Sequence, residues 1–305
     1  MGQLLNFTIG LSSIYLLVSL FVATIQELTA QVLALRARYL RVGIANLLND
    51  GASALGVLGA RTIKAPLVDQ FFANPLIEAL RSNRPGRTSD PSYLSRQTFT
   101  SIALQIAGVI GQASPNEIVQ AAKTLKNNSG APLAQAIAIF AEEAGGDLNK
   151  LQSRLGDWFD EAMDRVGGAY KRWTQIATII IGIGFAAALN VDSIAIAQWL
   201  IQSPEQAATL ANLNEKLPSK ISVDDPELRA QLLQAIDQTK VPFGWESQKK
   251  TSELTTGGWL LLVTGWILTG LAASLGSAFW FDTLKRFVSI RSTGDNPAAK
   301  QKSGN

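Results

Sequence analysis

The chain has 305 residues, of which 47% are hydrophobic and 17% are charged, and its formal net charge is +3 at pH 7. It contains no Cys and no His, which excludes the usual ligand sets of zinc, haem and iron–sulfur sites, and also Ser-His-Asp and Cys-His catalysis. We therefore expect no cofactor and no enzymatic activity. No basic cluster interleaved with aromatic residues is present, so we expect no nucleic-acid partner.

Three long segments without charge dominate the chain. They cover residues 1–26, 173–191 and 254–281. Roughly 20 apolar residues of helix are needed to cross a bilayer. The sequence therefore predicts an all-α membrane protein with three transmembrane helices, at 4–26, 173–200 and 256–281.

The polar stretch at 27–172 is long enough for a helical domain with its own core. Short helices are expected near 66–81, with a loop around Asn83–Asp90. Ser114, Pro115 and Glu117 form a helix-start signal, and a second helix is expected over Pro132–Ala144. From residue 148 to 172 an amphipathic pattern leads directly into the second apolar segment.

The stretch at 201–255 predicts a small helical external loop, because Pro204 and Pro226 follow capping residues. Asn190 and Asp192 lie near the outer end of the second span, where a capping or boundary role is expected. The basic tail at 282–305 is low in hydrophobicity from residue 293, and we expect disorder there.

Basic residues beside the spans indicate the orientation. Their distribution favours an outside N-terminus, a cytoplasmic domain at 27–172 and a cytoplasmic C-terminus, although Lys249 and Lys250 count against it. The location is then the bacterial inner membrane or an internal bacterial membrane. The residues that determine this topology are Arg36, Arg38, Arg41, Lys171, Arg172, Lys285 and Arg286.

Two segments indicate an interaction surface. The tripeptide Trp-Phe-Asp occurs at 158–160 and again at 280–282. Interfacial anchoring is the simpler interpretation, and the sharper one is that the two segments pack together beside the membrane. The segment 148–172 also carries an acidic row at helical spacing, formed by Asp157, Asp160, Glu161 and Asp164. The row is either a salt-bridged face, neutralised by Arg154, Arg165 and Arg172, or a site for a cation or a partner. The candidate surface comprises Asp157, Trp158, Asp160, Glu161, Asp164, Arg165, Trp280 and Asp282.

Small residues four positions apart occur in the apolar segments, including Gly182 with Ala186 and Ala272 with Gly276. Such pairs predict close helix–helix contact, either within the chain or between copies of it. They therefore leave a homo-oligomer open.

Several motifs resemble a group of uncharacterised bacterial multi-pass inner-membrane proteins. They are Phe-Ala-Asn-Pro-Leu-Ile at 72–77, Pro-Ser-Tyr-Leu at 91–94, Trp-Phe-Asp at 158–160, Met-Asp-Arg-Val at 163–166, Tyr-Lys-Arg at 170–172, Leu-Asn-Val-Asp at 189–192 and Phe-Trp-Phe-Asp at 279–282. The resemblance implies a bacterial membrane protein and brings no activity. The group has His where this chain has Asn74, and Ala-Pro where it has Ser277 and Ala278.

The function expected from these features is a membrane anchor or scaffold, which sits in the lipid bilayer and recruits a cytoplasmic protein partner. The alternative is an oligomeric channel or membrane-perturbing effector. An enzyme would have to work with carboxylates such as Asp157, Asp160 and Asp164 around magnesium.

Overall fold

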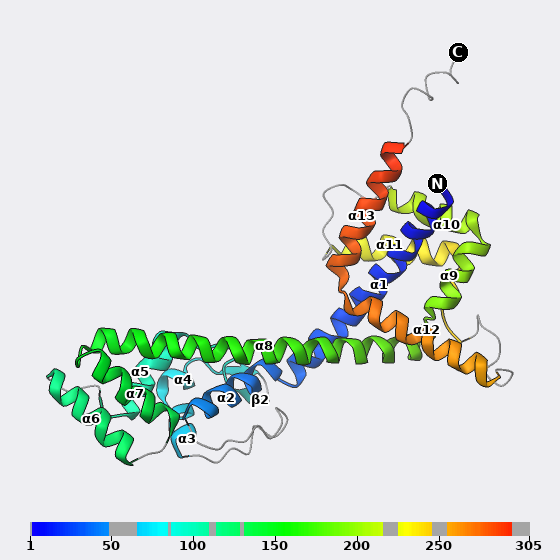
Figure 1. Ribbon diagram of the computed structural model, residues 1–305. Helices are drawn as coiled ribbons and strands as arrows, with labels where there is room; N and C mark the ends of the chain where they lie inside the picture. The colour runs from blue at the N-terminus through cyan, green and yellow to red at the C-terminus, as the bar shows by residue number, and fades with distance from the viewer. Residues whose placement is uncertain are drawn as a thin grey trace. The chain divides into compact units, whose positions relative to one another are not determined.

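The computed structural model describes residues 2–48, 66–84, 87–109, 114–128, 131–215, 225–245 and 255–294, and Figure 1 shows it as a ribbon. It is helical apart from one short hairpin. The chain divides into two compact units, one formed by Ala30–Trp173 and the other by Met1–Thr29 with Thr174–Asn305. The first is here called the central unit and the second the apolar unit. The bounds of the central unit are close to those of the expected domain at 27–172.

The helices of the central unit surround one core. Its elements are α2 (Leu35–Leu48), α3 (Pro66–Phe72), α4 (Pro75–Glu78), α5 (Arg96–Ile106), α6 (Pro115–Asn128), α7 (Pro132–Glu143) and the first part of α8 (Leu148–Ala188). In Figure 1, α5 and α7 lie along this part of α8. Leu151, Leu155 and Phe159 are buried on α8, which confirms the amphipathic pattern predicted for it.

Local signals place most of these helices. Ser114 and Glu117 cap α6 reciprocally: the Ser114 N–H donates to Glu117 Oε2 at 3.0 Å and the Glu117 N–H to Ser114 Oγ at 3.4 Å. The expected short helices correspond to α3 and α4. The expected loop at 83–90 differs from the structure, because strands β1 (Ser82–Arg84) and β2 (Arg87–Ser89) pair antiparallel within it.

The apolar unit contains the long uncharged segments. Its elements are α1 (Gly2–Val32) as far as Thr29, the end of α8, α9 (Ser193–Gln202), α10 (Pro204–Glu215), α11 (Pro226–Thr239), α12 (Thr256–Ser274) and α13 (Ser277–Gly294). Among the described residues, α1 and α12 are each long and apolar enough to cross a membrane. A third span arises only if α8 and α9, which bend by 59° at their junction, count as one.

Two of the expected membrane helices are broken. The span expected at 173–200 divides because Asn190 adopts a left-handed backbone with φ 49°, and Asp192 then caps α9 by accepting from the Ile194 N–H at 2.8 Å. This confirms the capping role expected for Asp192. The helix expected at 256–281 ends at Ser274, because Gly276 has φ 90°. Trp280 therefore lies in α13, which continues to Gly294; residues 295–305 lie outside the described part of the chain.

A polar chain joins three helices of the apolar unit. The Tyr15 hydroxyl of α1 donates to Ser193 Oγ of α9 at 2.9 Å, and Ser193 Oγ lies 2.8 Å from Thr269 Oγ1 of α12. Thr269 in turn donates to the Val191 carbonyl at 2.7 Å, in the break between α8 and α9. These hydrogen bonds satisfy hydroxyl groups that would be costly to bury without a partner. The hydrogen bonds therefore stabilise the bend between α8 and α9.

Glycines also bring the apolar helices into close contact. A Cβ on Gly182 would lie 3.0 Å from the Gly270 carbonyl oxygen, and one on Gly270 would lie 2.4 Å from Ile183 Cγ1. The end of α8 and α12 therefore cross at backbone distance. This bears out the expected close contact for Gly182, and the contact lies within one chain.

Candidate functional site

The acidic row on α8 is tied to α5 by one arginine. Arg96 Nη2 lies 2.6 Å from Asp157 Oδ1, and Arg96 Nη1 lies 3.1 Å from Asp160 Oδ2. Arg96 Nη2 also donates to the Ser153 carbonyl at 3.1 Å. The arginines expected to neutralise the row were Arg154, Arg165 and Arg172. That expectation was wrong for Asp157 and Asp160, because their partner comes from a distant element that helical spacing cannot reveal.

Because residue 156 is a glycine, Arg96 can lie close to the backbone of α8. A Cβ on Gly156 would lie 2.7 Å from Arg96 Nε, so glycine leaves the surface of α8 open where the guanidinium crosses it. The arginine then satisfies two carboxylates and a backbone carbonyl at once. Asp157 and Asp160 are held in place as a result.

The other two residues of the acidic row are exposed to solvent. Glu161 and Asp164 are exposed, and no ion pair of the described residues involves either. Arg165 Nε donates to the Glu161 backbone carbonyl at 3.4 Å. Within the described ranges, no three acidic side chains gather into a group that could hold a metal ion.

The two Trp-Phe-Asp segments lie in different units. In the central unit, Phe159 stacks on Phe99 with ring centroids 4.3 Å apart, and Trp158 packs against the same core. In the apolar unit, Trp280 Nε1 donates to the Ala272 carbonyl at 2.7 Å, and Asp282 is exposed. Each segment serves the packing of its own unit. A joint surface formed by both segments stays a prediction.

A groove lies between α2 and α8 of the central unit. Gly43 permits the close approach of these helices, because a Cβ there would lie 2.6 Å from Val166 Cγ2 and 3.0 Å from Met163 Cε. The groove has a volume of about 600 Å³, which is within the range of ligand-binding pockets. Buried apolar side chains form its base: Leu40, Leu94 and Phe159.

Three of the four tyrosines of the chain line this groove: Tyr39, Tyr93 and Tyr170. Tyr39 and Tyr170 pack edge to face with centroids 5.4 Å apart. Tyr93 is 77% exposed. Burial raises the pKa of Tyr39, and the neighbouring Tyr170 adds to this effect, so the Tyr39 hydroxyl stays protonated at neutral pH. Such a cluster offers aromatic faces and hydroxyls to a cation.

Charges of both signs line the same groove. Arg36 and Lys171 contribute positive charge, and Asp160 and Asp164 contribute negative charge. The Arg36 guanidinium lies 5.9 Å from the Tyr170 ring centroid, and its Nε donates to the Tyr170 hydroxyl at 3.4 Å. A groove with an apolar base and both charge types suits an amphipathic or zwitterionic ligand.

Sequence reasoning found only part of this groove. Asp160 and Asp164 were expected at a surface, and Arg36 and Lys171 were expected only as topology determinants. The motifs at 91–94, 158–160, 163–166 and 170–172, which carry the resemblance described above, all contribute lining residues. Tyr39 has no local signal, because only the tertiary structure brings it to the other tyrosines.

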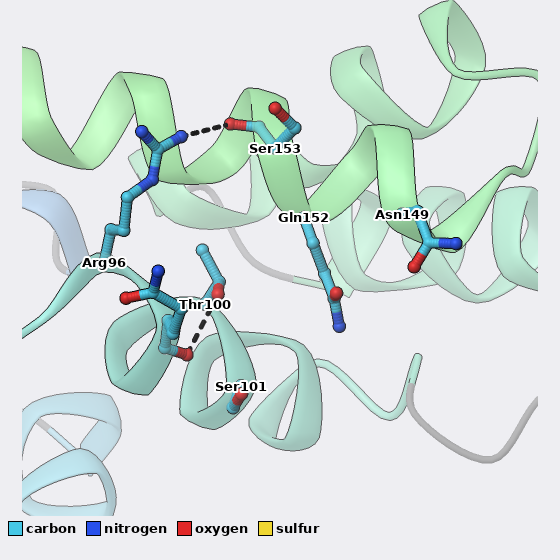
Figure 2. A pocket seen from close by; sticks show the side chains of 7 residues that line it. Arg96, Thr100, Ser101, Asn149, Gln152 and Ser153 are labelled. Carbon is cyan, nitrogen blue, oxygen red and sulfur yellow. Dashed lines mark hydrogen bonds between the residues drawn. The ribbon is translucent and has the colours of Figure 1, made fainter.

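A second, smaller pocket is polar. It has a volume of about 290 Å³ and lies between α5 and α8, as Figure 2 shows. Amides and hydroxyls line it together with Arg96, whose guanidinium is already bound to two carboxylates. Among these lining residues no other charge is present. The pocket therefore lacks a strong recognition element.

The expected topology determinants have structural contacts of their own. Arg41 on α2 lies 2.8 Å from Asp90 and 3.7 Å from Asp69, with its guanidinium 4.4 Å from the Phe72 ring centroid. Lys285 Nζ on α13 lies 4.3 Å from the Phe281 ring centroid. Arg38 lies on α2, Arg172 on α8 and Arg286 on α13. The orientation itself stays a prediction.

No family model, curated protein or solved structure matches this chain.

Proposed function

We propose that the chain is a membrane-anchored adaptor. In this proposal the apolar unit sits in a bilayer and the central unit holds a soluble, basic protein partner beside it. The membrane is the bacterial inner membrane or an internal one, the N-terminus is outside, and the central unit and C-terminus are cytoplasmic. The chain carries out no catalysis of its own.

The observation that carries this proposal is the acidic row on α8. Arg96 holds Asp157 and Asp160 in place, whereas the exposed Glu161 and Asp164 have no ion pair among the described residues. Unneutralised carboxylates on the surface of a helix steer basic partners toward that surface. The core of the central unit supports this role, because it buries a separate set of side chains that includes Phe71, Phe99 and Phe159.

The test is a cross-linking capture from native membranes with a charge-reversal variant and a matched control. Tagged wild-type chain, Glu161→Lys and Glu143→Lys would be purified in mild detergent after brief cross-linking, and companions would be quantified by mass spectrometry. Glu143 is also exposed but lies on α7. We expect a stoichiometric basic companion with wild type and Glu143→Lys, reduced about tenfold with Glu161→Lys. Equal recovery with all three chains would contradict the proposal.

The channel alternative has less support. It was expected from small-residue faces available to other copies of the chain, and Gly182 instead packs against Gly270 of the same chain. Dye leakage from liposomes containing the purified protein would nevertheless favour the channel over the adaptor.

A further inference from the structure

One glycine in the groove has no packing reason within the part of the chain that the structure describes. Gly167 lies in the interior of α8 and lines the groove. Glycine weakens a helix interior, yet a Cβ at this position would meet no atom within 4 Å. Gly43 and Gly156 each accommodate a neighbouring side chain, but Gly167 leaves only open space in the groove. That space is available to a ligand.

Opposite charges flank this space on the same helix. Asp164 and Lys171 both line the groove, both are exposed, and neither has an ion pair among the described residues. They lie about two turns apart, roughly 10 Å along the axis, and Gly167 lies between them. Side chains on a helix lean toward its N-terminus, so Lys171 leans toward Asp164. The pair is arranged for a ligand with both a cation and an anion.

The other lining groups match the same kind of ligand. Arg36 adds a second donor for an anion, and Tyr39, Tyr93 and Tyr170 add hydroxyls and aromatic faces for a cation. The base of the groove is apolar, with Leu40 7% exposed and Leu94 3% exposed. Such a base suits the hydrocarbon adjoining a polar headgroup.

The position of the groove in the chain indicates the source of the ligand. Lys171 lies two residues before the uncharged segment 173–191, and Arg36 follows the end of α1 at Val32. Tyrosine, lysine and arginine beside apolar segments typically lie at the headgroup level of a bilayer.

We propose that the groove binds the headgroup of a zwitterionic, ethanolamine-type phospholipid. Lys171 and Arg36 contact the phosphate, and Asp164 and the tyrosine hydroxyls accept hydrogen bonds from the primary ammonium. The open space at Gly167 admits the linker between the two charges. This inference shares with the proposed function the placement beside a membrane, but it does not depend on a protein partner.

The test measures lipid retention on the full-length chain. The protein is purified in mild detergent and supplied with phosphatidylethanolamine, phosphatidylcholine or phosphatidylglycerol of identical acyl chains, and bound lipid is quantified by native mass spectrometry. Gly167→Leu fills the groove. Gly168→Leu is the matched control, because a Cβ there meets only Arg172 Nη1 at 3.7 Å and Gly168 does not line the groove.

The expected result is a preference for phosphatidylethanolamine over both other lipids in wild type and Gly168→Leu, with retention reduced about tenfold in Gly167→Leu. Two charge variants separate the ends of the ligand. Lys171→Gln weakens retention of phosphatidylethanolamine and phosphatidylglycerol alike, since both carry the phosphate. Asp164→Asn removes the preference for phosphatidylethanolamine over phosphatidylcholine, since only the primary ammonium donates hydrogen bonds.

Equal retention of the three lipids by the wild-type chain would overturn the inference, as would unchanged retention in Gly167→Leu. A preference for phosphatidylglycerol would do the same, because it would indicate an anion site only. Failure here is distinguishable from failure of the adaptor proposal, which is measured by the companion lost on Glu161→Lys.

Discussion

Two helix glycines of the central unit should respond in opposite ways to the same substitution. Alanine favours a helix interior over glycine by about 0.5 to 1 kcal/mol. At Gly167 the new methyl group meets nothing within 4 Å, so this gain is kept in full. At Gly43 the methyl group would lie 2.6 Å from the stiff Val166 side chain, and overpacking of this kind costs about 1 to 3 kcal/mol. Gly43→Ala should therefore be destabilising by as much as about 2 kcal/mol.

The assay is thermal unfolding of the full-length chain in one detergent, followed by tryptophan fluorescence. A change of 1 kcal/mol shifts the Tm of a unit of this size by about 3 to 4 °C. Gly167→Ala should therefore raise the Tm by about 2 to 4 °C, and Gly43→Ala should lower it by several degrees. Gly168→Ala serves as a second open position. A lower Tm for Gly167→Ala would refute the conclusion that a methyl group fits at position 167. A higher Tm for Gly43→Ala would refute the conclusion that position 43 has no room for one.

Three further predictions concern polar contacts. Arg96→Ala removes the link between α5 and α8 and should cost about 1 kcal/mol, discounted because its partners are half exposed; denaturant unfolding showing no loss would contradict this role. Thr269→Val should cost about 1 kcal/mol, because it removes the hydroxyl that donates to the Val191 carbonyl and contacts Ser193 Oγ, whereas Thr269→Ser should be nearly neutral in the same assay. The Lys123 ammonium lowers the pKa of Glu142, so Lys123→Ala should raise that pKa in an NMR titration. A depressed carboxyl pKa contributes stability above the unfolded pKa, and this small contribution is lost as the pH falls through the folded value.

Much of the helical architecture was predictable from local signals. Uncharged length indicated the apolar helices, and capping residues indicated the starts of α6, α10 and α11 within a residue or so. These features depend on neighbours along the chain. The bend between α8 and α9 was only half predicted: Asp192 was recognised as a cap, but the left-handed backbone at Asn190 was not.

By itself, the sequence determined that the chain is helical, that it contains segments able to cross a membrane, and that chemistry dependent on Cys or His is absent. Only the tertiary structure decided that Arg96 pairs with Asp157 and Asp160, and that Tyr39, Tyr93 and Tyr170 line one groove. The physical reason is separation along the chain. Hydrophobic periodicity shows which residues share a face of one helix. Contacts between helices depend in addition on how closely the helices approach, which is determined at positions such as Gly43, where a Cβ would lie 2.6 Å from Val166 Cγ2.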